Sequence, residues 1–156
     1  MNAGEIKNAV LVALAAVGTF IANALGGWDA ALAVLIGFMA ADYVTGILVA
    51  LVFHASPKTE GGGLASGECF KGLVRKCLIL VFVWLGTMLD QVIGGAYVRT
   101  AIILFYIGNE GLSIIENVVL MGMPYPKFLG QALEALRDKG DGGDGERGDN
   151  GVKKEE

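Results

Sequence analysis

The stretch that decides the fold is FYIGNEGLSIIENVV, residues 105–119. Most of its residues are apolar enough for a helix that crosses a membrane, but five polar side chains interrupt it: Asn109, Glu110, Ser113, Glu116 and Asn117. At about 100° per residue these side chains, with Tyr106, fall within an arc of roughly 120°. The stretch therefore predicts a membrane helix that carries one polar stripe.

The composition of the whole chain agrees with a membrane protein. Hydrophobic residues make up 54% of the 156 residues, and the mean hydropathy is +0.57. The charged residues, 18% of the chain, are concentrated in a few places and leave long apolar runs between them. This pattern is typical of an all-α protein that crosses a membrane several times. The net charge of −4 gives no basic surface for nucleic acid, so no nucleic-acid partner is expected.

Four runs are long enough to cross a bilayer as helices. We expect a transmembrane domain over residues 1–124 with spans at about 8–28, 30–54, 77–98 and 100–123. Ala22-Asn23-Ala24 in the first run resembles a signal-peptidase site. The residues before it carry both Glu5 and Lys7 and so lack a net positive charge, which favours an uncleaved span.

Polar segments separate and follow these runs. Pro57 and Gly61-Gly62-Gly63 predict an irregular loop, and from Leu64 a short amphipathic helix is expected to lead into the third span. Pro124 and Pro126 end the fourth run. Residues 125–139 predict an amphipathic helix on the membrane surface, and residues 140–156 a disordered charged tail.

Lysine and arginine predict the orientation. The turn between the first two spans has neither residue, whereas the loop before the third span has Lys58, Lys71, Arg75 and Lys76. Because basic residues favour the cytoplasmic side, both termini are predicted to be cytoplasmic. Lys71, Arg75 and Lys76 are also expected to anchor the third span against anionic lipid, although a plain topology signal explains them equally well.

Carboxylates inside the spans need an explanation, because an ionised carboxylate at the bilayer centre costs roughly 2.5 to 3.5 kcal/mol. Hydrogen bonds within one bundle could satisfy them, or stripes from several subunits could meet and line water. The sequence favours the second arrangement, since no Lys or Arg lies inside the expected spans and Arg99, at the edge of one, could pair only with Asp90. The predicted pore or helix-packing residues are Asp42, Thr45, Gly46, Asp90, Asn109, Glu110, Ser113, Glu116 and Asn117.

Catalytic interpretations fit poorly. Asp42 and Asp90 lack the glycine-flanked signature of intramembrane aspartyl proteases, and His54 is the only histidine. Cys69 and Cys77 are too few for a disulfide framework or a cysteine metal site. The glycine run lacks the context of a phosphate-binding loop. We therefore expect no enzyme activity, no cofactor and no metal.

The order of several short motifs resembles the toxin-secretion/phage-lysis holin family. These are Asp42-Tyr43-Val44-Thr45-Gly46, the segment SGECFKGLVRK at 66–76, Asp90, and the stretch 105–117 with its Asn-Glu and Glu-Asn pairs. The resemblance covers roughly residues 30–123, and the charged tail is also similar. It does not explain the long glycine-rich loop after Pro57 or the length of the acidic tail.

The resemblance implies a bacteriophage protein that forms homo-oligomers in the lipid of the host's cytoplasmic membrane. It would open lesions at a set time and so release a functional partner, an endolysin, to lyse the host. An antiholin would be a further partner. Two other classes stay open, namely a small ion channel or exporter subunit and an antiholin-type regulator.

Overall fold

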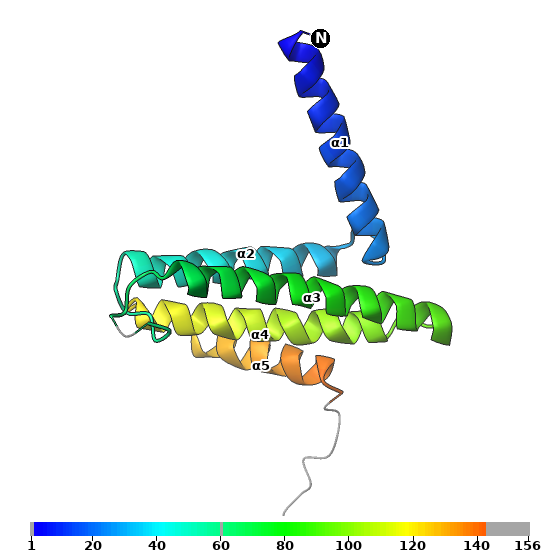
Figure 1. The fold of residues 1–156 in the computed structure, drawn as a ribbon. Helices are drawn as coiled ribbons and strands as arrows, with labels where there is room; N and C mark the ends of the chain where they lie inside the picture. The colour runs from blue at the N-terminus through cyan, green and yellow to red at the C-terminus, as the bar shows by residue number, and fades with distance from the viewer. Residues whose placement is uncertain (1, 60, 143–156) are drawn as a thin grey trace, which may run out of the picture.

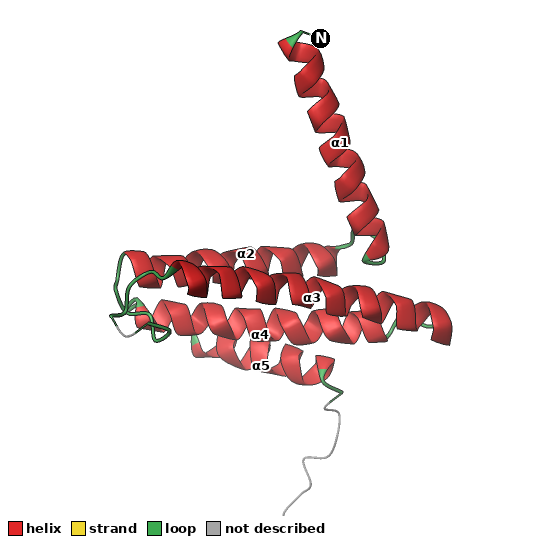
Figure 2. Ribbon diagram, viewed as in Figure 1, coloured by secondary structure: helices red, strands yellow, loops and turns green. Residues whose placement is uncertain are grey.

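A computed structural model of the chain describes residues 2–59 and 61–142. It contains the helices α1 (Ala3–Ala24), α2 (Ala30–Leu51), α3 (Ser66–Ile93), α4 (Val98–Leu120) and α5 (Lys127–Gly140). Within these described residues there is no strand (Figure 2). The first four helices are each long and apolar enough to cross a membrane, which confirms the predicted all-α, multi-pass class. Apart from 140–142, the predicted tail lies outside the described residues.

Helices α2 to α5 lie side by side, each running opposite to the helix before it, whereas α1 projects away from them (Figure 1). Helix α4 is central, because it packs against α2, α3 and α5. Helix α1 has no buried residue along its length, and its large apolar side chains, such as Phe20, are exposed. The bundle of α2, α3 and α4 therefore holds the polar stripe, and α1 is attached to it only at one end.

The helix boundaries follow from local chemistry. The Asp29 carboxylate caps α2 by accepting a 2.8 Å hydrogen bond from the Leu32 amide. Gly94 ends α3 with a φ of 74°, a left-handed conformation that glycine adopts without strain. Helix α3 begins at Ser66, well before the expected span, because the amphipathic segment and the span form one continuous helix.

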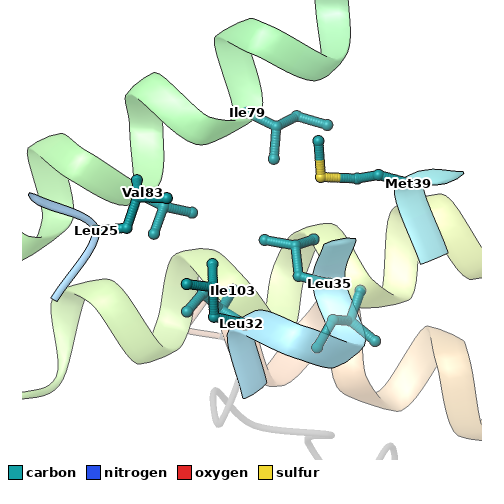
Figure 3. Packing of buried hydrophobic residues seen from close by; sticks show 8 residues of the cluster. Leu25, Leu32, Leu35, Met39, Ile79, Val83 and Ile103 are labelled. Carbon is teal, nitrogen blue, oxygen red and sulfur yellow. The ribbon is translucent and has the colours of Figure 1, made fainter. Parts of the chain in front are cut away.

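An apolar core fills the half of the bundle next to the α1–α2 turn. Leu32, Leu35, Val83 and Ile103 are fully buried there. Figure 3 shows these side chains pointing toward one another from three helices, with Met39 and Ile79 at the edge of the group. The polar residues of the same helices follow further along the bundle, toward the loop that joins α2 to α3. The core and the polar site are thus successive layers of one bundle.

Helix α5 packs along α4 instead of extending away from the bundle. Leu133 is buried against α4, and Gly140 lies against the backbone of Ala101 and Phe105. Its residues agree closely with the predicted amphipathic helix. The predicted position on a membrane surface stays a prediction, and the structure adds a contact with α4 that the sequence did not indicate.

Candidate functional site

A buried lysine joins the three helices of the bundle. The ammonium group of Lys76, on α3, donates hydrogen bonds to the carboxylates of Asp42 on α2 and Glu110 on α4. Glu110 is only 2% exposed, and Lys76 is 9% exposed. A charge is tolerated in such surroundings when it is paired and hydrogen-bonded. The three side chains therefore hold α2, α3 and α4 in one register.

Asn117 extends this cluster toward the end of α4. Its side-chain amide donates to the Asp42 carboxylate at 3.2 Å and to the Thr45 hydroxyl at 2.9 Å. The Thr45 hydroxyl donates in turn to the Asp42 carbonyl at 3.0 Å. Gly46 lies beside the amide, where an added Cβ would come within 3.8 Å of the Asn117 nitrogen. Five predicted site residues, Asp42, Thr45, Gly46, Glu110 and Asn117, are thus brought together.

The charges of this cluster do not balance, since one ammonium faces two carboxylates. Every buried side-chain nitrogen and oxygen of the described residues nevertheless has a hydrogen-bond partner. A cavity of about 140 Å³ adjoins the cluster, between α2, α3, α4 and the loop that joins α2 to α3. Glu116, Asn117, Arg75 and Ser113 contribute to its lining. A cavity of this size and polarity has room for several water molecules.

Lys76 differs from the sequence-based expectation in two respects. The sequence suggested acids without a basic partner, and it assigned Lys76 to a basic anchor on the membrane surface. The lysine instead points into the bundle. One signal could have located it, because the buried residues of α3 recur at three- and four-residue spacing from Lys76 through Ile79 and Val83 to Asp90. Lys71 and Arg75 are exposed, so their role as anchors stays a prediction.

Asp90 lies apart from this cluster and caps the start of α4. Its carboxylate accepts hydrogen bonds of 2.9 to 3.0 Å from the amides of Tyr97, which precedes α4, and of Val98 and Arg99, the first two residues of α4. It therefore satisfies the free amides at the start of that helix. The Arg99 side chain, the one basic group that the sequence allowed as a partner for Asp90, points elsewhere.

The Arg99 guanidinium fastens the α1–α2 turn to the start of α4. It donates to the carbonyls of Leu25 at 2.5 Å and Gly27 at 3.1 Å, and to the Asp29 carboxylate at 2.6 Å. Its hydrogen bond lowers the pKa of the Asp29 carboxyl below the ordinary value. Gly26, with a φ of 87°, leaves room for the arginine, since a Cβ there would lie 2.7 Å from its Nε. The two turns are thus held at the same end of the bundle.

The polar stripe of α4 is divided between the interior and the surface. Glu110 is buried and Ser113 is half-buried, whereas Asn109 and Glu116 are exposed. The two exposed side chains are seven residues apart and therefore lie on one face of the helix. No group of His, Cys, Asp and Glu side chains among the described residues has a geometry that could hold a metal ion.

The fold and this site define a multi-pass membrane bundle with charged groups between its spans. A model of the bacteriophage holin family matches residues 19–138, most of the chain. The chain therefore belongs to the bacteriophage holin family. This agrees with the resemblance that its motifs suggested, and it supports both a holin role and the expectation of a protein without enzyme activity.

Individual relatives agree with this assignment. An uncharacterised protein of Clostridium perfringens is 38% identical over 124 residues, which are 78% of this chain and 86% of the relative. Another Clostridium perfringens protein, of 14.9 kDa, is 35% identical over 86% of this chain and 98% of its own length. A protein of Bacillus phage phi105 named "probable holin" is 33% identical over 64% of this chain and 69% of its own length. No solved structure gives a significant match.

Proposed function

We propose that this protein is a phage holin that assembles in the host's cytoplasmic membrane and opens lesions at a set time. The lesions would let an endolysin cross the membrane and reach the cell wall. Its partners are then further copies of the same chain, membrane lipid, the endolysin as a functional partner, and an antiholin where one is encoded. The lysine and arginine distribution supports an orientation with both termini in the cytoplasm.

The observation that carries this proposal is the exposure of Asn109 and Glu116 on one face of α4. Both lie within a helix that is otherwise suited to cross a membrane. A carboxylate and an amide on such a surface are costly against acyl chains, so they favour contact with another polar surface or with water. A second copy of the chain would supply such a surface, and a ring of copies would enclose water.

The internal cluster explains how a single copy stays harmless at low density. Asp42, Glu110 and Asn117 are satisfied within the bundle, so one chain needs no partner for them. At high density, contacts between the exposed polar faces would compete with these internal contacts. The spans could then exchange partners around water. Such a change needs no chemical reaction, only a shift between two sets of contacts.

Controlled expression tests this function. The chain is produced from a tightly regulated promoter in a bacterium, while turbidity, viability and membrane potential are followed together. We expect a silent interval and then an abrupt loss of potential, and with a co-expressed endolysin an abrupt fall in turbidity. A leak that grows in proportion to the amount of protein would identify a channel. No effect despite verified membrane insertion would contradict a holin and favour a regulator.

A further inference from the structure

Helix α1 has two unlike sides, and its own chain covers neither of them. At about 100° per residue, Asn8, Thr19 and Asn23 fall within an arc of roughly 60°. Most of its large apolar side chains lie on the opposite side, namely Ile6, Val10, Leu14, Val17, Phe20 and Ile21. No residue of α1 is buried. The apolar side suits lipid, whereas the side that carries the two asparagine amides needs a polar partner within a membrane.

The contact between the α1–α2 turn and α4 sets the depth at which each residue of α1 lies. The Arg99 guanidinium donates to the Leu25 carbonyl at 2.5 Å, so these two residues share one depth. Helix α1 projects away from the bundle (Figure 1). To cross the same bilayer as α4, it has to turn about its attached end and run opposite to α4. Asn8 lies 17 residues before Leu25 and Glu116 lies 17 residues after Arg99, so both are about 25 Å from that contact.

At these depths the polar side of α1 matches the exposed polar face of α4. The Asn8 amide is level with the Glu116 carboxylate, and Lys7 brings a positive charge to almost the same level. Lys7 is exposed and forms no ion pair with another described residue. Ala15, seven residues after Asn8 and on the same side of α1, is level with Asn109 and leaves room for its amide. An amide and an ammonium group together can satisfy a carboxylate that acyl chains cannot.

The α1 of the same chain is held on the wrong side of α4 to make this contact. The turn that joins α1 to α2 is bonded to Arg99, next to α2. On α4, the surface between Gly111 and Asn117 contacts α2. Asn109 and Glu116 lie roughly 150° around the helix from the middle of that surface. The short turn cannot carry α1 around the bundle to reach them, so the helix that fits this face belongs to another copy.

We propose that α1 of one copy packs antiparallel against the face of α4 that carries Asn109 and Glu116 in a second copy. This inference rests on the proposed function and deepens it. Each copy gives one α1 and receives one, so the contact is head-to-tail and not symmetric. Contacts of this kind add copies one after another until a ring closes. Helix α1 is then the element that connects neighbouring copies.

Disulfide cross-linking in membranes tests this contact. Cys69→Ser and Cys77→Ser first remove the native thiols of the full chain. Cysteines then replace Val12 and Leu112, which the same count of residues places at one depth. Oxidation should give a ladder of dimers, trimers and larger species that grows with the amount of protein, since each copy carries one thiol for each of two neighbours. Val10→Cys in place of Val12→Cys is the matched control, because Val10 lies on the apolar side of α1, and it should abolish the ladder.

Chains with one cysteine distinguish the head-to-tail contact from other arrangements. Neither single-cysteine chain should cross-link by itself, whereas the two chains produced together should give a mixed dimer. Dimers of Val12→Cys alone as the main product would mean that α1 pairs with α1, and dimers of Leu112→Cys alone that α4 pairs with α4. A disulfide within one double-cysteine chain would mean that α1 packs on its own bundle. Each of these results would overturn the proposal, as would the absence of any cross-link.

A double-mutant cycle tests the match between Lys7 and Glu116. In the double-cysteine chain, Lys7→Gln and Glu116→Gln should each lower the cross-linked fraction roughly threefold. The two changes together should lower it no further, because both remove the same contact. Lys71→Gln, which changes another exposed lysine, should match the parent. Additive effects, or no effect of either change, would refute this register. The readout needs no lysis, so a chain that cross-links as expected but never depolarises cells would contradict only the proposed holin function.

Discussion

At the scale of single residues, Lys76 is the cation that two carboxylates share inside the bundle. Replacing it with methionine would keep much of the side-chain volume but leave Asp42 and Glu110 facing each other without compensation. Removing one partner of a buried ion pair costs about 3 to 5 kcal/mol. We therefore expect Lys76→Met to lower the thermal stability of the detergent-solubilised protein strongly, as measured by aggregation on heating.

The same assay provides its own controls. Lys71→Met removes an exposed lysine that pairs with Glu68 at the surface, so it should change little. Adding Asp42→Asn and Glu110→Gln to Lys76→Met removes the unbalanced charges and should restore much of the stability. A Lys76→Met protein that is as stable as the parent chain would contradict the buried cluster.

Replacing glutamate by glutamine at position 110 and at position 116 compares the buried part of the polar stripe with its exposed part. Glu110→Gln alters the internal cluster, whereas Glu116→Gln alters the exposed face. Under the proposed function, both should change the time of membrane depolarisation more than the amount of protein in the membrane. Glu110→Gln should act by weakening the contact with Lys76 within one chain, and Glu116→Gln by weakening contact between copies.

Measuring the time of depolarisation together with the cross-linking between copies distinguishes these two effects. Glu116→Gln is expected to delay depolarisation and to lower the density-dependent disulfide cross-linking between copies that carry a cysteine in place of Leu112 and another in place of Val12, whereas Glu110→Gln should not lower it. If both variants depolarise cells at the parent's time while accumulating normally, the role proposed for the stripe is refuted.

At the scale of helices, Gly86 sets the distance between α3 and α4. A Cβ there would lie 2.7 Å from the Ile102 side chain and 3.0 Å from the Arg99 Cα. Gly86→Val should therefore force the two helices apart and lower both thermal stability and accumulation. Gly37→Val is the matched control, because a Cβ at Gly37 meets nothing within 4 Å. Equal behaviour of the two variants would argue against the close α3–α4 contact.

The sequence predicted the helices better than the contacts between them. Uncharged runs and their flanking glycines and prolines are local features, so they located four spans and the amphipathic α5. The sequence also located the one-sided stripe of α4, but it favoured contacts of that stripe between subunits, whereas Glu110 and Asn117 bond to α3 and α2 within one chain. Lys76 could not be paired from the sequence, because each of its partners lies 34 residues away and it precedes the uncharged run. Asp90 was likewise expected to be a pore or helix-packing residue, since its capping role depends on the reversal at Gly94.

At the scale of the whole molecule, the two ends of the bundle carry different kinds of loop. The α1–α2 and α3–α4 turns are short and are joined through Arg99. The opposite end has the longer α2–α3 loop, with Lys58, and the connection to α5. The basic residues in and after the long loop outnumber Arg99 at the other end, and this supports an orientation in which the short turns face outward and the long loop faces the cytoplasm.

Thiol labelling of intact protoplasts tests this orientation. In the Cys69→Ser, Cys77→Ser background, Trp28→Cys places one thiol in the α1–α2 turn, where Trp28 is 65% exposed. Lys58→Cys places one in the exposed α2–α3 loop. Because the turn is predicted to face outward, a membrane-impermeant maleimide should label Trp28→Cys before any depolarisation and Lys58→Cys only after the protoplasts are opened. The reverse labelling pattern would show that the bundle is inserted the other way round, with its basic loop facing outward, and would contradict the predicted orientation. Labelling of both sites before depolarisation would instead mean that α2 does not cross the membrane.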